Sequence, residues 1–544
     1  MQVQEGFDAI ALSLFVSRLE AVCDEMGVVL RNAALSTNIR DRLDFSCAVF
    51  DNTGALCAQA AHIPVHLGSM AFAMADLVGN IDWVDGDMII VNDPYLGGTH
   101  LPDVTIIAPV YAAGELVAFV ANRAHHADIG ASSPGSMPIS QTLAEEGLVI
   151  EPCHLLRGDQ IQQNQLTRII DGTRNPDHTR GDFFAQISAN RTGRTRLSEF
   201  VRRMGVEAFR DGLIALNDYG ERLARAALAE IPDGTYSFTD LMDDDGQGNF
   251  DLAICVTLRV CDGNVECDFS GTAAAVDGNI NCPLAVAAAA TFYCFRCLMP
   301  PHTPACAGSL RPIKLHAPEG CLVNARRPSA VAAGNVETST RIVDVVLGAL
   351  ASVLPMRIPA ASQGSMNNLA IGGLLSVAGE QHAWDYYETI GGGMGAGASG
   401  GGLSGVQTHM TNTLNTPVEV IESRFPLRVV RYALRRNSGG SGHRSGGDGL
   451  IREFECLAPA KVTLIGERRL HAPWGLAGGS QGSCGVAWLN EKRLPGKISL
   501  ELAVGDQLRI ETPGGGGWGE TDSGGTTADH ASAPRTDANP SKRP

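Results

Sequence analysis

The chain has 544 residues, of which 59 are acidic and 42 basic, and its formal net charge is −17. Proteins that bind nucleic acids or anionic membrane surfaces present clusters of Lys and Arg to the phosphates, so this charge balance argues against both kinds of partner. The sequence has no run of about 18 apolar residues, which argues against a membrane-spanning helix.

The 14 cysteines are scattered, many of them in apolar stretches, and no basic segment of the signal-peptide type precedes the first apolar residues. Buried free thiols explain such cysteines better than a zinc site does, because no C-x-x-C pair is matched by a second one. We therefore expect a cytoplasmic protein.

Helical and strand patterns alternate along the chain. In chain order we expect a helix at 7–35, a hairpin at 45–60, a strand at 88–91, a hairpin at 104–126, helices within 155–230, strands at 235–238, 252–260 and 265–269, and helices at 284–298 and 341–354. This order predicts a mixed α/β (α+β) fold of several domains, with largely antiparallel sheets and flanking helices.

Domain boundaries are expected where the pattern changes. We assign 1–230 to a domain with the N-terminal helix, the hairpins and a candidate site, 231–380 to a central strand and helix domain, and 381–518 to a glycine-rich C-terminal domain. The remaining stretch, 519–544, lacks large apolar side chains, so we expect it to be disordered.

Glycine is unusually frequent, with 63 residues in the chain, and 15 of these fall within residues 391–449. A flexible linker is one explanation, but Met410, Leu414 and Phe425 lie among these glycines, which is not typical of linkers. We expect ordered tight turns that bring backbone amides close to another group. The segment Gly391–Gly397 is similar to a phosphate-binding loop in composition alone.

The strongest functional signal is a cluster of His and Asp residues at the open end of the second hairpin. Five such residues fall within 29 positions, although the whole chain has 14 histidines: His100, Asp103, His125, His126 and Asp128. Two imidazoles and a carboxylate that leave a coordination position open are typical of a site for zinc, manganese or iron, which lowers the pKa of a bound water. Polar strand-end residues that bond to the backbone are the alternative explanation.

The hairpin geometry decides which of these side chains meet. Folding the strands about Ala113 pairs residues whose numbers sum to about 226: Leu101 with His125, and Asp103 with Arg123. Opposed Cβ atoms lie about 4.5–5.5 Å apart. Because side chains alternate along a strand, one of the two adjacent histidines shares a face with Asp103, and an even sum selects His125. For His100 to join them, the strand must break at Leu101-Pro102.

Three further sets of polar residues are weaker candidates. Glu388 precedes the first glycine run, where its carboxylate can bind a substrate nitrogen or act as a base. His62 and His66 either orient the metal ligands or are ordinary loop residues. Surface ion pairing is the simpler explanation for a polar cluster after the first helix, which consists of Asn38, Arg40, Asp41, Arg42 and Asp44.

Several longer motifs lie along the chain. They are Ser46-Cys47-Ala48, His62–Met70, Asn92–Tyr95, Gly97–Asp103, Ala124–Gly130, Phe269–Thr272, Gly334–Ser339, Ser438–Gly442 and Thr512–Gly514. In this order they resemble the B component of the hydantoinase/oxoprolinase family, over about residues 6 to 518.

The resemblance implies an ATP-dependent enzyme with two kinds of component. A separate A component with an actin-like nucleotide fold phosphorylates the carbonyl oxygen of a lactam or other cyclic amide, and the B component completes the hydrolysis at a metal site. The ligands carried over are His100, Asp103 and His125, with His126 and Asp128 as neighbours, and in the related acetone carboxylases the equivalent chain binds manganese. A reference pKa of about 6.5 suits His126 to proton transfer.

We therefore expect a metal-dependent hydrolase subunit that acts on a hydantoin, N-methylhydantoin, 5-oxoproline or related ring, within a hetero-oligomer whose A-type component binds the ATP. The metal is expected to be manganese, zinc or iron. The lack of a G-x-x-x-x-G-K-[ST] loop agrees with ATP binding in the partner. A subunit of an ATP-dependent ketone carboxylase, acting on acetone or acetophenone, is one alternative, and a non-catalytic assembly subunit is another.

Overall fold

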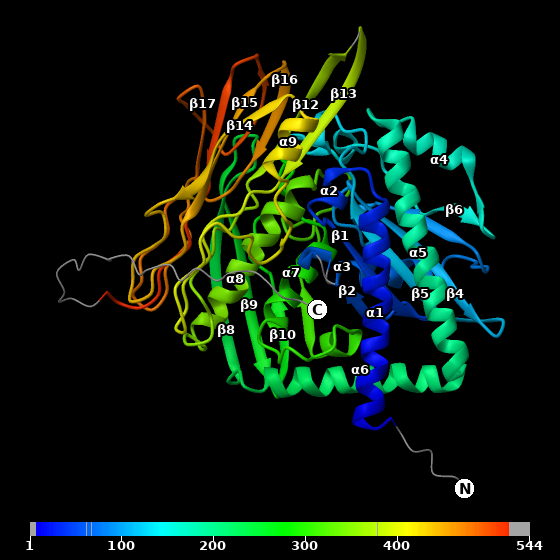
Figure 1. Ribbon diagram of the computed structural model, residues 1–544. Coiled ribbons are helices and arrows are strands. Elements are labelled where there is room, and N and C mark those ends of the chain that lie inside the picture. Colours follow the sequence, from blue (N-terminus) through cyan, green and yellow to red (C-terminus); the bar gives the residue numbers. More distant parts are fainter. Residues whose placement is uncertain (1–6, 61–62, 67, 378, 522–544) are drawn as a thin grey trace, which may run out of the picture.

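The computed structural model describes residues 7–60, 63–66, 68–377 and 379–521, and it has the mixed α/β architecture that the sequence predicts (Figure 1). The described strands form four sheets. Their strands pair antiparallel, except that β10 (Asn264–Asp268) runs parallel to β11 (Ile313–His316). The expectation of largely antiparallel sheets with flanking helices is confirmed.

The first part of the chain forms a seven-stranded sheet with helices packed against it. Its elements are α1 (Ala9–Ala33), α2 (Thr37–Arg40), β1 (Phe45–Asp51), β2 (Leu56–Ala60), α3 (Ser69–Val78), β3 (Met88–Val91), β4 (Asp103–Ala112), β5 (Glu115–His125), β6 (Cys153–Arg157), β7 (Gln160–Ile161), α4 (Gln163–Ile170), α5 (Pro176–Met204) and α6 (Val206–Leu228). The strand order is β2-β1-β5-β4-β3-β6-β7. The predicted long helix and both hairpins are confirmed, whereas β6 and β7 occupy the beginning of the stretch that was expected to be helical.

Helix α1 packs against one face of this sheet. The Asp8 side chain caps its first turn by accepting a hydrogen bond of 2.7 Å from the backbone amide of Ala11. Its buried stripe packs on α5, β1 and β2, and Figure 1 shows α1 running beside α5. A buried Leu or Phe contributes roughly 1.5–3 kcal/mol to folding. The stripe therefore anchors the layer that carries the second hairpin.

The central part of the chain builds a second sheet and two buried helices. Its elements are β8 (Gly234–Asp244), β9 (Phe250–Cys261), β10, α7 (Leu284–Arg296), β11, a π-helical turn (Gly334–Thr338) and α8 (Ser339–Ala351), and the sheet order is β11-β10-β9-β8. Helices α7 and α8 pack against each other, and α8 also lies on β8 and β9. Apolar residues on nearly all sides of both helices, as the sequence indicates, suit this sandwiched position.

The last part of the chain forms two more sheets. Its elements are β12 (Asn368–Val377), β13 (Glu380–Glu388), α9 (Val418–Arg424), β14 (Leu427–Arg435), β15 (Gly449–Cys456), β16 (Ala460–Ile465), β17 (Val486–Leu489), β18 (Lys492–Leu494), β19 (Lys497–Leu502) and β20 (Gln507–Glu511). One sheet has the order β13-β12-β16-β19 and the other β14-β15-β20-β17-β18. Strand β13 lies toward the N-terminal layer (Figure 1), where its residues reach the candidate site.

The glycine-rich segments are ordered and pack backbone against backbone. A Cβ on Gly393 would lie 2.0 Å from the carbonyl oxygen of Gly447, and a Cβ on Gly515 would lie 2.1 Å from that of Met394. The amide of Gly393 donates to the carbonyl of Pro513 at 3.0 Å. Glycine is required here because no side chain fits between the segments. The flexible-linker alternative is thus wrong, and the expectation of ordered backbone is confirmed.

The same contacts argue against a phosphate-binding loop at Gly391–Gly397. The amides of Gly392, Met394 and Ala396 already donate to carbonyl oxygens within the chain, at 2.9 Å each. A phosphate cradle needs amides that are free to meet the ligand. The group that these amides approach is therefore the neighbouring backbone.

None of the described helices is both long and apolar enough to cross a membrane. The domain boundaries at 230, 380 and 518 stay predictions. Both His62 and residues 522–544 of the expected disordered tail lie outside the described residues.

Candidate metal centre and adjoining cavity

The second hairpin closes with a register that differs from the predicted one by two residues. Asp103 pairs with His125, so the residue numbers sum to 228 rather than 226, and the predicted pair of Asp103 with Arg123 is wrong. The turn consists of Ala113 and Gly114, both with positive φ, and an irregularity between Val110 and Tyr111 shifts the register once more. The sum is still even, so Asp103 and His125 share a face, as predicted.

The side chain of His100 lies on the same side as Asp103 and His125 because strand β4 begins only after His100. Strand β4 starts at Asp103, and the amide of Asp103 donates to the carbonyl of His100 at 3.1 Å in the turn that precedes the strand. The chain therefore breaks at Leu101-Pro102, which is the condition that the sequence sets for His100 to face the same side.

Three donor atoms converge in the buried space at this end of the hairpin. The distances are 3.2 Å from His100 Nε2 to His125 Nδ1, 3.1 Å from His100 Nε2 to Asp103 Oδ1, and 3.0 Å from His125 Nδ1 to Asp103 Oδ1. All three residues are at most 2% exposed. Ligands that share one cation at about 2.1 Å lie about 3.0–3.4 Å apart. The triangle therefore has the dimensions of a metal site.

A backbone carbonyl fixes the orientation of His100. The Nδ1 of His100 lies 3.2 Å from the carbonyl oxygen of Ala332, and because a carbonyl oxygen only accepts, Nδ1 carries the hydrogen. The lone pair of the neutral ring is then on Nε2, which faces Asp103 and His125. Burial by itself lowers the pKa of His100, but the Asp103 carboxylate outweighs burial and raises this pKa above its usual value.

Further side chains surround the carboxylate of Asp103. The hydroxyl of Thr99 donates to Oδ2, and Nε2 of His66 lies 3.5 Å from the same oxygen while its Nδ1 contacts the Ser46 hydroxyl at 2.9 Å. Burial opposes the charge of Asp103, yet the imidazoles hold the pKa of this carboxyl well below its usual range. From the sequence, His66 was either a residue that orients a metal ligand or an ordinary loop residue. Its position beside Asp103 fits the first of these roles.

Two residues that the sequence analysis did not select complete the centre. Asn335, in the π-helical turn, places Nδ2 3.1 Å from His100 Nε2, and the ring of Tyr387 stacks on His125 at 4.8 Å. A Cβ at Gly334 would lie 1.9 Å from the carbonyl oxygen of Asn281, so glycine is needed for this turn to approach the hairpin. In the sequence, the Gly334–Ser339 motif was the one feature that could have indicated Asn335 as a site residue. Nothing in the sequence indicated Tyr387 except its position next to Glu388.

The centre encloses a cavity of about 20 Å³, which is room for one ion or one water molecule. Residues from the hairpin, the π-helical turn, β13 and the segment before β1 line it: Asp44, Ile63, Val65, His66, His100, Asp103, His125, Asn335, Val336, Met366, Tyr387, Thr389 and Thr411.

The adjacent His126 faces away from this triangle. Its ring packs on Phe183 at 4.5 Å, and its Nε2 lies 2.9 Å from Oε1 of Gln186, whose amide nitrogen donates to the Val104 carbonyl. This orientation of Gln186 puts the His126 hydrogen on Nε2 and leaves Nδ1 as the base nitrogen. Burial lowers the pKa of His126, so the ring is neutral at pH 7.

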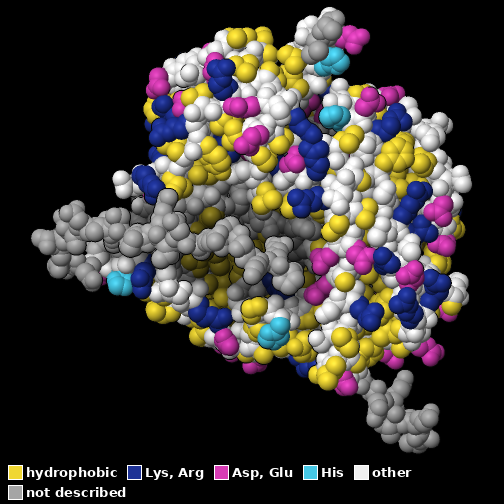
Figure 2. Space-filling view, viewed as in Figure 1, with side chains coloured by type: hydrophobic (Ala, Val, Ile, Leu, Met, Phe, Trp, Pro, Cys, Tyr) yellow, Lys and Arg dark blue, Asp and Glu magenta, His cyan; other side chains and the backbone are white. Residues whose placement is uncertain are grey.

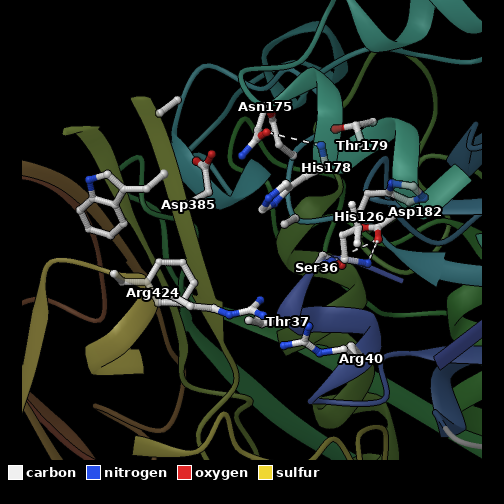
Figure 3. A pocket seen from close by; sticks show the side chains of 16 residues that line it. Ser36, Thr37, Arg40, His126, Asn175, His178, Thr179, Asp182, Asp385 and Arg424 are labelled. Atoms are coloured by element: carbon white, nitrogen blue, oxygen red, sulfur yellow. Dashed lines mark hydrogen bonds between the residues drawn. The ribbon is translucent and has the colours of Figure 1, made fainter. Parts of the chain in front are cut away.

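His126 lines a larger cavity of about 410 Å³ (Figure 3). Residues of α2, the beginning of α5, β13 and α9 form its polar walls: Ser36, Thr37, Arg40, Asp128, Asn175, His178, Thr179, Asp182, Asp385 and Arg424. Burial and the nearby Asp128 carboxylate raise the pKa of Asp385 to about 6. Asp128 itself accepts a hydrogen bond from the backbone amide of Gly130 at 2.8 Å and pairs with Arg174 at 3.4 Å.

The large cavity and the candidate metal centre are neighbours, because the same strands line both. The end of β5 contributes His125 to the centre, and His126 directly after it lines the cavity. On β13, Tyr387 lines the centre and Asp385 the cavity, and two residues along a strand span about 6.6 Å. The structure thus brings five of the predicted residues to one region.

Glu388 does not belong to this region. It is fully buried, its Oε1 lies 3.3 Å from Nε of Arg42, and it accepts hydrogen bonds from the Tyr386 hydroxyl at 2.7 Å and the Thr416 amide at 3.2 Å. Alternation along β13 turns it away from the face of Tyr387. We interpret Glu388 as a structural partner of Arg42 rather than a catalytic base.

In the polar cluster after the first helix, Arg40 and Asp41 form a partly exposed ion pair at 3.0 Å, as expected from the sequence, but Arg42 and Asp44 are buried. Arg42 is fully buried and donates to the carbonyl of Tyr387 at 3.3 Å and to the Thr389 hydroxyl at 2.9 Å. It joins the N-terminal layer to β13, and Asp44 lines the small cavity. For Arg42, surface ion pairing was the wrong explanation because this side chain is buried against residues of β13, although Arg42 and Tyr387 are 345 residues apart in the chain.

The model of the hydantoinase B/oxoprolinase family matches residues 8–521. The chain belongs to this family. It is 39% identical to 5-oxoprolinase 1 of Arabidopsis thaliana, over 94% of this chain but 42% of the plant protein. It is also 32% identical to a protein of Pseudomonas sp. (strain NS671) that is named as the B component of a D-/L-hydantoinase, over 94% of this chain and 90% of that one.

Two solved structures are similar over most of the chain. The ATP-dependent caprolactamase from Pseudomonas jessenii matches with a TM-score of 0.87 and 26% identity, over 94% of this chain and 91% of that one. An acetone carboxylase in its nucleotide-free state has the same fold, with a TM-score of 0.86 and 19% identity over 94% of this chain and 76% of the other. The predicted family relationship is therefore confirmed, and the likeness to acetone carboxylase is a likeness of fold.

Proposed function

We propose that the chain is the metal-dependent hydrolytic component of an ATP-dependent cyclic amidase. The observation that carries the proposal is the buried triangle of His100, Asp103 and His125, with donor atoms 3.0–3.2 Å apart. Its place beside a cavity of small-molecule size supports a role in catalysis rather than in assembly alone.

The donor set fits a divalent cation. Electron pairs of His100 Nε2, His125 Nδ1 and Asp103 Oδ1 are directed toward one small space, where a positive charge stabilises them. Two imidazole nitrogens and one carboxylate oxygen suit manganese, zinc or iron. When bound, such a cation lowers the pKa of water and polarises a carbonyl oxygen.

The other residues of the region would serve binding and proton transfer. The ring of Tyr387 covers His125 and keeps bulk water from that side of the centre. His126 lines the cavity, and its Nδ1 would accept and return a proton while the hydrogen bond between Nε2 and Gln186 fixes the ring. Asp128, tied to Gly130 and Arg174, would shape the loop that closes the cavity beside His126.

A partner would supply the ATP-dependent step. The likeness to the B component of a hydantoinase, and a span of 42% of the plant 5-oxoprolinase, both support a separate chain or region for phosphorylation of the amide. We propose an A-type, actin-like ATPase in a hetero-oligomer with this chain.

The test uses this chain purified with its partner. We expect ATP-dependent ring opening when lactams and hydantoins are supplied, together with about one divalent metal per copy of this chain. Incorporation of labelled bicarbonate into acetone or acetophenone, without ring opening, would overturn the proposal in favour of a ketone carboxylase. Full turnover by a complex with no bound metal would overturn the role of the triangle.

A further inference from the structure

The charges around the large cavity are separated in space. Figure 3 shows the guanidinium groups of Arg40 and Arg424 on the side of Thr37, whereas Asp385 faces the cavity from the side of Asn175. Asp182 also lines the cavity beside Ser36, but its Oδ1 accepts hydrogen bonds from the backbone amides of Leu35 and Ser36 at 2.7 and 3.1 Å. A site that presents cations at one end and a carboxylate at the other is complementary to a molecule with both charges. This separation therefore points to a ligand that carries a negative and a positive group. On the face of the molecule seen in Figure 2, basic and acidic side chains are intermixed.

Two of these polar groups, the guanidinium of Arg424 and the hydroxyl of Ser36, lack a partner among the residues that the structure describes. Arg424 is an exposed residue, and its guanidinium forms no ion pair or hydrogen bond with any residue that the structure describes. The guanidinium of Arg40, by contrast, donates to both carboxylate oxygens of its neighbour Asp41, at 3.2 and 3.0 Å. The hydroxyl of Ser36 is buried and finds no hydrogen-bond partner among the described residues. A buried hydroxyl without a partner destabilises the protein, so a ligand that forms a hydrogen bond with it is favoured.

The carboxylate of Asp385 is fixed through one of its two oxygens, and the other oxygen has no bonding partner among the described residues. Its Oδ1 accepts a hydrogen bond of 3.1 Å from the amide of Gly135 and lies 3.8 Å from Arg174, while no described residue bonds to Oδ2. The carboxylate of Asp128 lies nearby and pairs mainly with Arg174. Asp128 and Asp385 carry two negative charges beside the single positive charge of Arg174. A second cation at Asp385 would balance the remaining charge.

The products of hydrolytic ring opening can be compared with this arrangement of two arginines and one carboxylate. Hydrolysis of a lactam breaks the C–N bond, adds the hydroxyl of water to the acyl carbon and a hydrogen to the nitrogen, and leaves a carboxylate and an ammonium on one product. Hydrolysis of a hydantoin leaves a carboxylate and an uncharged ureido group. The two classes of product thus differ at the end that Asp385 would meet.

We propose that the cavity beside His126 binds an amino acid formed by lactam opening, with its carboxylate at Arg40 and Arg424 and its ammonium at Asp385. The inference rests on the proposed function and narrows its substrate class to lactams. The volume of about 410 Å³ suits a molecule of this size.

Calorimetric titration of the full chain in complex with its partner tests this proposal. The probes are L-glutamate and 6-aminohexanoate, and N-carbamoyl-L-glutamate is the matched ureido compound. We expect the amino acids to bind, Arg424→Met to weaken them at least tenfold, and Asp385→Asn to weaken them similarly while leaving the ureido compound unchanged. Asp385→Asn keeps the oxygen that accepts from Gly135, so the fold is retained.

Control substitutions at exposed sites are Arg431→Met and Asp211→Asn, which are expected to bind the amino acids like wild type. The proposal is overturned if neither amino acid binds at millimolar concentration, if both variants keep wild-type affinity, or if the ureido compound binds as well as glutamate. His100→Ala separates this outcome from failure of the proposed function. Its loss of turnover tests the metal centre, while its amino-acid affinity is expected to stay unchanged.

Discussion

His100 and Ala332 lie 232 residues apart in the sequence, and Nδ1 of His100 donates a hydrogen bond of 3.2 Å to the carbonyl oxygen of Ala332. The bond fixes the ring so that Nε2 faces Asp103 and His125. The end of the hairpin is thus completed by a turn from the central part of the chain, and contacts of this kind maintain the whole region.

His100→Ala is expected to remove bound metal and to lower turnover by at least about 100-fold, because one of three ligand atoms is lost. Elemental analysis of the purified complex and a lactam turnover assay measure the two effects. The control is His302→Ala, since His302 is exposed and outside both cavities. Wild-type metal content in His100→Ala would contradict the assignment.

Gly334→Ala is expected to destabilise the chain by more than about 2 kcal/mol. The new Cβ would lie 1.9 Å from the carbonyl oxygen of Asn281, and backbone on both sides must shift to relieve this overlap. Urea denaturation compares it with Gly79→Ala, where no atom lies within 4 Å of the new Cβ. Equal midpoints for the two variants would refute the packing argument.

Glu337→Gln is expected to change how stability depends on pH. Burial and the nearby Glu467 raise the pKa of Glu337 to about 8, from 4.5 in the unfolded chain. The folded state therefore binds this proton more tightly, and its stabilising effect is complete below about pH 4.5 and is lost as the pH rises toward 8.

The glutamine variant cannot lose this proton, so its stability relative to wild type should rise between about pH 5 and 8 by at least about 1.4 kcal/mol, the equivalent of one pKa unit. Denaturation midpoints at several pH values give the comparison, with the exposed Glu501→Gln as the control. A difference that stays constant with pH would show that Glu337 ionises normally.

Arg42→Met is expected to cost about 3–5 kcal/mol, because it leaves the Glu388 carboxylate buried without its cation. The double variant Arg42→Met/Glu388→Gln should recover part of this loss. Glu388→Gln alone should keep metal content and turnover per folded molecule. A Glu388→Gln variant that folds, holds metal and is inactive would restore Glu388 as a catalytic candidate.

Sequence patterns were sufficient for the local part of the site. Alternation and an even register selected His125 over His126, and the Leu101-Pro102 step placed His100 correctly. The register itself was missed by two residues, because a two-residue turn and an irregularity near Val110 have no clear signature in side-chain pattern.

Sequence patterns could not predict the contacts between segments that lie far apart in the chain. Asn335 reaches His100 across 235 residues and Arg42 reaches Tyr387 across 345, and neither pairing leaves a periodic signal. For the same reason, glycines that were correctly expected to be ordered gave no indication of which backbone they approach.

The glycine contacts also constrain when this part of the molecule can form. Gly393 donates to Pro513, and Gly446 and Gly393 lie against Gly515. Earlier glycine segments therefore lack these partners until the ribosome has delivered residues 513–515. The N-terminal layer can form while synthesis continues, but the glycine segment at 391–397, which follows β13, is expected to reach its final position only after residues 513–515 have emerged.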